Sequence, residues 1–298
     1  MACIVLATRL IVFRRWITGF TIESSWKWAF PAIPALIASS VVCSPTIRLE
    51  AGWRTLLQYL AAVVMLAPPI CTLGARKPGL GAWHWFVVLP MVLVLCWPAM
   101  SQVISSRGLE SLHLGGPALI AIGLVMVMGL GTGLGTEMIL PASLCGAAIF
   151  CCLAPSAGWS FLPPSSPLAA PWILLLSERV ATKHLQTIHA RLTSAATMSE
   201  AMDAIWHLFQ YCYGLPWTRR VQDRVNQFAA REQWTVQLTL DGFRTAAGQS
   251  ASDAQLEMPC SSFCWVLQRF VSDEWIGRAL SRFRRDAETG TRDEADSR

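Results

Sequence analysis

Charged residues are scarce in this sequence. They make up 14% of its 298 residues, whereas ordinary soluble domains carry about 25%. Hydrophobic residues make up 53%, which excludes a disordered or collagen-like chain, because neither class holds so much apolar mass. The composition also argues against a single soluble globular domain.

The shortage of charge is confined to the first 177 residues. That part holds nine basic and four acidic residues, and residues 178–298 hold 15 of each. The net charge of +5 therefore comes entirely from the apolar part. Basic residues near membrane spans set the orientation of a chain in the bilayer. We interpret the excess as an orientation signal and expect the lipid bilayer, with no nucleic acid, as a partner.

Long uncharged intervals fill the apolar part. A helix needs about 20 mostly apolar residues to cross the hydrocarbon core, and soluble helices rarely lack charge on every face. The intervals predict an α-helical, multi-pass transmembrane bundle at residues 28–177, with about six spans and five as the alternative. The spans are expected near residues 28–47, 55–75, 80–100, 114–136, 138–154 and 159–177. The last interval is ambiguous, because five prolines fall between positions 155 and 171.

The basic residues of alternate loops predict an orientation. Six of them fall on the N-terminal side and three on the other, which puts the N-terminus in the cytoplasm. Six spans return the C-terminus to the cytoplasm, and five would export it. We expect a multi-pass protein of the cell (inner) membrane with both termini cytoplasmic.

The N-terminal segment, residues 1–27, mixes apolar residues with arginines. Arg9 interrupts the apolar stretch, and Arg14 and Arg15 follow it, which is not the order of a signal peptide. The pattern is typical of an amphipathic helix lying in the cytoplasmic interface. Mistakenly translated upstream sequence is the alternative.

A run of glycines marks the fourth predicted span. Two overlapping G-x-x-x-G spacings let helices approach closely. The run therefore predicts a helix-packing face, with an unwound segment that exposes carbonyl groups to a substrate as the alternative. The residues are Gly129, Gly131, Gly133 and Gly135.

Two ionisable residues, His84 and Glu137, form a possible intramembrane polar site, because such residues within spans are often functional. His84 lies between two tryptophans and Glu137 separates two apolar intervals, so an interfacial position and a loop position are the competing interpretations. No Asp, Lys or Arg lies in the middle of any interval, which disfavours an ion-coupled transporter.

Catalytic and metal-binding motifs are missing. The sequence contains no G-x-S-x-G, P-loop or H-E-x-x-H pattern, and its ten cysteines do not have the paired spacing of a zinc site. We therefore predict no catalytic residues, no metal, no cofactor and no enzyme.

Residues 178–285 predict a cytosolic, mostly helical domain, followed by a disordered tail at 286–298. Thr197 and Glu200 have capping-box spacing, and Gly214 is expected to end that helix. Alternation over 234–240 predicts one short strand, with residues 243–245 or another chain as its possible partner. Residues 246–254 are expected to be a linker, with short helices at 261–270 and 272–285.

Polar side chains of this domain carry two hypotheses. Arg219, Arg220 and Arg224 form a basic cluster, a possible contact for lipid headgroups or an acidic partner. Glu200, Asp203 and His207 share a helix face; such a set could bind a metal, but a solvated face is the favoured interpretation.

The sequence therefore predicts an integral membrane protein with a non-enzymatic role. The leading hypothesis is a membrane-anchored assembly or docking component whose cytosolic tail binds a protein partner or a second copy of the chain. The alternative is a permease-like channel or transporter for a small neutral or hydrophobic solute.

Overall fold

The computed structural model describes residues 1–43, 47, 49–74, 82–105, 112–281 and 283. Over these residues the chain is mostly helical, as predicted, with the helices α1 to α10, a further helix at 273–281 and one two-stranded sheet. It forms two compact units. The first contains the described residues of 1–18, 22–75 and 79–182, and the second contains those of 19–21 and 183–283.

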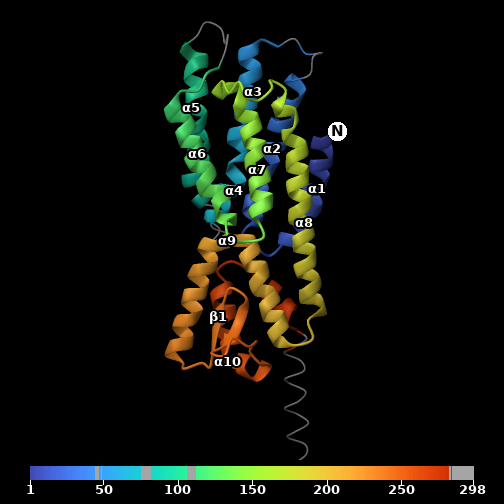
Figure 1. Ribbon diagram of the computed structural model, residues 1–298, viewed down its shortest axis with the longest axis vertical. Helices are drawn as coiled ribbons and strands as arrows, with labels where there is room; N and C mark the ends of the chain where they lie inside the picture. Colours follow the sequence, from blue (N-terminus) through green and yellow to red (C-terminus); the bar gives the residue numbers. More distant parts are fainter. Residues whose placement is uncertain (44–46, 48, 75–81, 106–111, 282, 284–298) are drawn as a thin grey trace, which may run out of the picture. The chain divides into compact units, whose positions relative to one another are not determined.

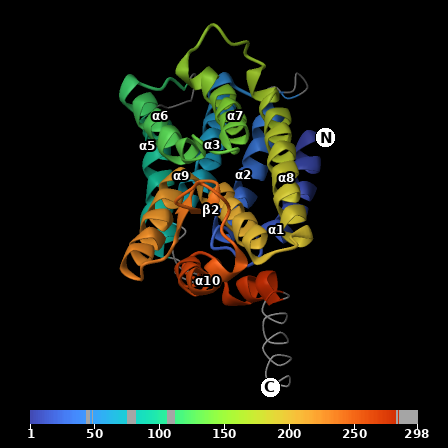
Figure 2. The ribbon, with the colours of Figure 1, turned by 60° about the horizontal axis from the view of Figure 1, so that its bottom comes forward.

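The first unit is a bundle of helices. The helices α2, α3 and α7 lie side by side within it (Figure 1 and Figure 2). Its α-helices are α1 (Ala2–Ile17), α2 (Glu23–Val42), α3 (Ala51–Met65), α4 (Ala67–Leu73), α5 (Leu89–Ser105), α6 (Gly116–Leu130), α7 (Ile139–Ala157) and the start of α8 (Ala170–Ser194). Three short turns of other helix types are η1 (His84–Val88), η2 (Gly131–Gly133) and η3 (Ser166–Leu168).

Four helical segments of the described chain are long and apolar enough to cross a membrane. They are Ala51–Leu73, His84–Ser105, Gly116–Gly133 and Ile139–Ala157, and they correspond to four of the predicted spans. The helix α2 is not among them; it carries Glu23 and Lys27. The structure is thus compatible with a membrane protein, and its count of four stands below the predicted six.

The expected span at 159–177 differs from the structure. Residues 159–169 form turns and the short η3 helix, and α8 begins only at Ala170. The prolines of this stretch, Pro163, Pro164 and Pro167, lack the backbone N–H that an α-helix needs. From Ala170 one continuous helix of 25 residues extends to Ser194.

The N-terminal helix α1 runs antiparallel along α2. The Trp26 indole N–H donates to the Leu10 carbonyl at 2.7 Å, and the Arg14 guanidinium lies 2.8 Å from the Glu23 carboxylate. These two contacts hold α1 against α2.

Buried side chains of α3 form the centre of the first unit. Tyr59 is fully buried, and its hydroxyl donates to the Leu95 carbonyl of α5. Around Tyr59, α3 also buries several small residues, including Ala62. Small side chains and a satisfied phenol permit close helix packing without an unpaired polar group.

The second unit contains a kinked helix and a hairpin. The helix α9 (Met198–Arg231) contains Gly214 at φ 72° and ψ 179°, which divides it into two helical halves at the predicted stop. Strands β1 (Val236–Thr239) and β2 (Gly242–Thr245) pair antiparallel, so the predicted hairpin partner is confirmed. Asn226 covers one edge by bonding both the N–H and the carbonyl of Leu238, at 2.8 and 2.9 Å.

Aromatic side chains form the core of the second unit. The rings of Trp206 and Phe209 stack at 5.7 Å between centroids, and Phe243 meets Phe263 edge-on at 5.4 Å. Residues 19–21 belong to this unit as well: the Thr21 N–H donates to the Phe270 carbonyl at 2.8 Å. This early segment was not predicted to join the tail.

Two boundaries in the tail differ from the sequence analysis. The helix α10 (Asp253–Leu267) begins within the expected linker, where Ser252 and Gln255 form a capping box. The following helix covers 273–281. The linker interpretation rested on small polar residues, and one of them is the helix cap. The expected disordered tail at 286–298 lies outside the described residues.

Candidate functional site

The first glycine of the predicted packing face, Gly129, does lie against another helix. A Cβ added there would stand 2.9 Å from the Pro69 Cβ and 3.2 Å from the Ile70 Cδ1 of α4. The absence of a side chain thus allows α6 and α4 to approach closely.

The other three glycines lie beyond the end of α6 and do not share one helix face with Gly129. Gly131 and Gly133 belong to η2, and Gly135 lies in the turn before α7 at φ 75°. A Cβ at Gly133 would be 3.2 Å from the Ala142 Cβ, whereas one at Gly131 would meet nothing closer than 3.9 Å. Gly131, Gly133 and Gly135 therefore belong to the connection between α6 and α7 rather than to one packing stripe with Gly129.

An apolar groove lies between α6 and α7, and Gly131 borders it. Its volume is about 490 Å3. Ser143 is the only hydroxyl-bearing residue of its lining. We call it the α6–α7 groove; its lining is Met126, Val127, Leu130, Gly131, Leu134, Ile139, Ala142, Ser143, Gly146, Ala147, Phe150, Cys151 and Leu162.

His84 lies in a polar contact between three helical segments. The Trp28 indole N–H donates to His84 Nδ1 at 2.9 Å, and the Cys71 sulfur lies 3.4 Å from the same nitrogen. An indole N–H is only a donor, so Nδ1 of His84 is an acceptor and the ring proton is assigned to Nε2. In a Cys–His nucleophilic pair this lone pair would have to accept the thiol proton. Trp28 already occupies it, so the cluster joins α2, α4 and η1 rather than activating Cys71.

Glu137 lies in the turn that leads into α7 and is exposed. His84 belongs to η1, some 50 residues earlier in the chain, and contacts Trp28 and Cys71. Among the described residues no group of three or more His, Cys, Asp and Glu side chains has the arrangement of a metal site.

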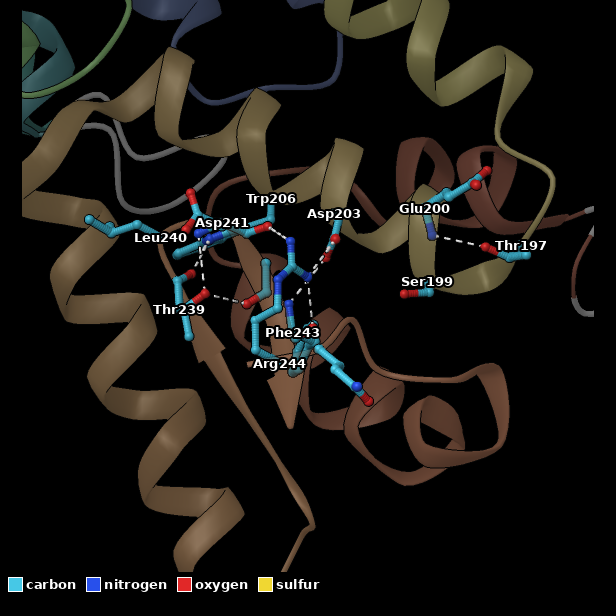
Figure 3. A network of polar contacts seen from close by, with 12 residues as sticks. Thr197, Ser199, Glu200, Asp203, Trp206, Thr239, Leu240, Asp241, Phe243 and Arg244 are labelled. Atoms are coloured by element: carbon cyan, nitrogen blue, oxygen red, sulfur yellow. Dashed lines mark hydrogen bonds and ion pairs between the residues drawn. The ribbon is translucent and has the colours of Figure 1, made fainter. Parts of the chain in front are cut away.

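Asp203 connects α9 to the hairpin rather than facing solvent as expected. Its carboxylate accepts from the Phe243 N–H at 3.1 Å and lies 2.9 Å from Nη1 of Arg244 (Figure 3). On the next turn of α9, the Trp206 indole N–H donates to the Thr239 carbonyl at 2.8 Å. All of these groups are satisfied within the fold, which makes the network a structural clamp.

The N-terminus of α9 shows the predicted cap. The Thr197 hydroxyl accepts from the Glu200 N–H at 3.2 Å (Figure 3), and the Glu200 carboxylate accepts from the Ala196 N–H at 2.7 Å. Asp253 of α10 accepts from two further N–H groups, those of Met198 and Ser199, at 3.1 and 2.9 Å. The first-turn donors of α9 are therefore shared between the local Thr197 hydroxyl and the distant Asp253 carboxylate.

The predicted basic cluster divides between two faces of α9. Three or four positions separate each member of the series Trp217, Arg220, Arg224 and Phe228 from the next, so these four side chains share one face of α9. Arg219 lies about 100° around the helix from Arg220. The guanidinium carbons of Arg220 and Arg224 lie 4.9 and 4.7 Å from the ring centroids of Trp217 and Phe228.

The helix α10 extends this face. The Trp265 ring meets Phe228 edge-on at 5.9 Å, and the Arg269 guanidinium lies 5.2 Å from the Trp265 centroid. Trp265 is 47% exposed. We call the set the arginine–aromatic stripe; it consists of Trp217, Arg220, Arg224, Phe228, Trp265 and Arg269.

Sequence reasoning named only Arg220 and Arg224 of the six residues in the stripe. The spacing of Trp217, Arg220, Arg224 and Phe228 was visible as a helical repeat, but Trp265 and Arg269 join it only through the packing of α10 on α9. It also missed the pair of Arg9 and Glu178 in the first unit, whose Nε and Oε2 atoms lie 2.5 Å apart. Both depend on contacts between distant parts of the chain.

Comparison of the chain with known protein families, curated proteins and solved structures finds no match.

Proposed function

We propose that the chain is a membrane-anchored docking component. In this proposal the first unit is a non-enzymatic anchor in the cell membrane, and the second is a cytosolic module that binds an acidic surface of a partner protein. Four apolar helices and a separate aromatic core in the second unit support this division. The observation that carries the proposal is the arginine–aromatic stripe.

The stripe has the composition of a protein-binding surface. Trp and Arg are enriched among the residues that dominate binding energies, and a guanidinium held over a ring loses less freedom when it binds. In the described chain, none of the three arginines of the stripe lies within ion-pair distance of a carboxylate. The three positive charges are thus available to carboxylates of a partner.

In-cell photo-cross-linking of the full chain tests this proposal. A photoreactive amino acid replaces Trp265 in one variant and Gln249, exposed after β2, in a control. We expect a defined protein adduct from position 265 and none from 249. The double variant Arg220→Glu, Arg224→Glu should reduce the adduct at least tenfold, and Arg219→Glu, on the other face, should leave it.

Three outcomes would contradict the docking proposal. One is equal loss in Arg219→Glu, which would show a general charge effect. Another is an adduct with lipid alone, which would assign the stripe to headgroups. The third is the absence of any protein adduct from position 265.

We also propose six spans and a cytoplasmic tail. The spans are α2, the four apolar segments and the first half of α8. Arg14, Arg15 and Lys27 lie near the facing ends of α1 and α2, and positive charge marks the cytoplasmic side. This charge places the beginning of α2 on the cytoplasmic side, and six spans return the tail to that side. A reporter after residue 285 should respond as cytoplasmic, and an exported reporter would refute this topology.

A second candidate function is the handling of a hydrophobic solute in the first unit. The α6–α7 groove favours it, and the apolar lining disfavours a polar solute. Liposomes that hold the full chain should speed the movement of a fluorescent fatty acid between leaflets without raising glycerol permeability. Faster glycerol entry, or no effect on the fatty acid, would contradict this candidate.

A further inference from the structure

The α6–α7 groove has the length of one leaflet of a bilayer. Along α7 its lining extends from Ile139 to Cys151, which is about 18 Å at 1.5 Å per residue. Half of the hydrocarbon core of a bilayer is about 15 Å. The volume of about 490 Å3 falls within the range of roughly 300–1,000 Å3 for small-molecule sites.

Small residues of α7 make the floor of the groove. Two pairs of small residues, each four positions apart, lie on one side of the helix: Ala142 with Gly146, and Ser143 with Ala147. Gly146 also brings the two helices together, since a Cβ there would lie 3.1 Å from the Leu130 Cδ1. Small side chains at these positions leave space along α7 for a flexible chain.

Aromatic rings lie at one end of the groove. Phe150 lines it and stacks on Trp159 at 4.2 Å between centroids, and Phe161 lies 6.1 Å from Phe150. The opposite end is formed by η2 and the start of α7. The groove therefore has two defined ends.

The groove opens onto an apolar surface. Val127 and Leu134 at its rim are 68% and 56% exposed, and Ser143 and Ala147 in its floor are exposed as well. Both flanking helices are among the four apolar enough to cross a membrane. The medium beside such helices is lipid hydrocarbon, whose chemistry matches the lining.

We propose that the α6–α7 groove is a discrete, saturable binding site for one hydrocarbon chain of a membrane lipid. The inference rests on the proposed membrane placement of α6 and α7 and is independent of docking by the tail. A bound chain would occupy the space beside Gly131, where the absence of a side chain leaves the groove open.

Photolabelling of the full chain tests the site. The chain is reconstituted in phosphatidylcholine vesicles with increasing amounts of a palmitate that carries a diazirine in mid-chain, and labelled peptides are mapped by mass spectrometry. Labelling of 126–151 should saturate. Labelling of the exposed α5 face around Leu93 and Val94 should rise linearly, as bulk lipid contact does.

Substitutions that fill the groove sharpen the test. Gly131→Leu adds a side chain where the nearest neighbours of its Cβ are 3.9 Å away, and Ala147→Leu fills the floor from the exposed side of α7. Each should reduce saturable labelling at least fivefold without changing the labelling of α5. The matched control is Gly123→Leu on α6, where a Cβ meets nothing within 4 Å; it should label like the wild type.

The possible outcomes separate cleanly. Linear labelling of the groove, or saturable labelling that survives both filling variants, overturns the proposal. A cross-link across α6 and α7 to a second copy, with no lipid label, would assign the groove to an interface between chains instead. Release of the chain from vesicles by alkaline carbonate would overturn the membrane placement itself, whereas retention without saturable labelling overturns only the groove.

Discussion

Removal of the Asp203 carboxylate should release the hairpin from α9. The Phe243 N–H is fully buried and Asp203 is its acceptor, so Asp203→Ala leaves a buried donor unsatisfied, at a cost of about 2 kcal/mol. It also removes the ion pair between Asp203 and Arg244. These two side chains are 19% and 21% exposed, and a pair this accessible contributes about 1 kcal/mol. The expected total is about 3 kcal/mol of local stability, or roughly 150-fold in the opening equilibrium.

Hydrogen–deuterium exchange of the full chain measures this effect where it arises. Amides of β1 and β2 should exchange roughly 150-fold faster in Asp203→Ala, because local opening limits their exchange. Asp203→Asn keeps an acceptor for the Phe243 N–H and should speed exchange only about fivefold. Amides of α7 provide the internal reference. Equal effects of the two variants, or unchanged exchange in Asp203→Ala, would refute the clamp.

Three other predictions concern single positions. Gly242→Ala should loosen the same hairpin by about 3 kcal/mol or more in the same exchange experiment, because a Cβ would lie 1.9 Å from the Asp203 Oδ1 at a backbone φ of 115°. Gly248→Ala, at φ 76° with open space, should cost only about 1 kcal/mol, and equal effects would contradict the clash. Arg9→Ala should destabilise the first unit by about 3 kcal/mol in thermal unfolding in detergent, because the Glu178 side chain, 7% exposed, loses its cation. Adding Glu178→Gln to this variant should restore part of the lost stability. No recovery would contradict a charge effect. Burial raises the pKa of the Cys212 thiol to about 12, so its reactive thiolate forms only at very alkaline pH. Mass spectrometry should therefore find little iodoacetamide labelling of this cysteine at pH 8. Fast labelling at that pH would contradict the burial.

Local patterns were sufficient where neighbouring residues decide the structure. The alternation around Val236 predicted a strand, and the nearby Gly242 turn supplied its partner. The Thr197 and Glu200 spacing predicted a helix start, and Gly214 a helix break. In each case the deciding hydrogen bonds or backbone angles involve residues within a few positions.

Distant contacts decided the features that were missed. Asp203 has the spacing of a solvated helix face, and only the position of Arg244, 41 residues later, buries it partly. Arg219 and Arg220 are neighbours in sequence, yet α10 meets only the face that carries Arg220 and Arg224. The apolar composition of residues 159–177 favoured a span, whereas the missing N–H groups of its prolines favoured turns.

The strand-like contact of residues 19–21 has a consequence for the order of folding. Phe20 is buried against Trp275, and the Ser272 N–H donates to the Gly19 carbonyl at 2.7 Å, so two segments about 250 residues apart in the sequence must meet. During translation, residues 19–21 cannot form these contacts until about 250 further residues have been made, because the residues that they contact come later in the chain. A fragment that starts after α8 would lack Phe20 and leave an unfilled place against Trp275. The second unit is thus encoded discontinuously, and it cannot be completed before residues 270–276 have been made.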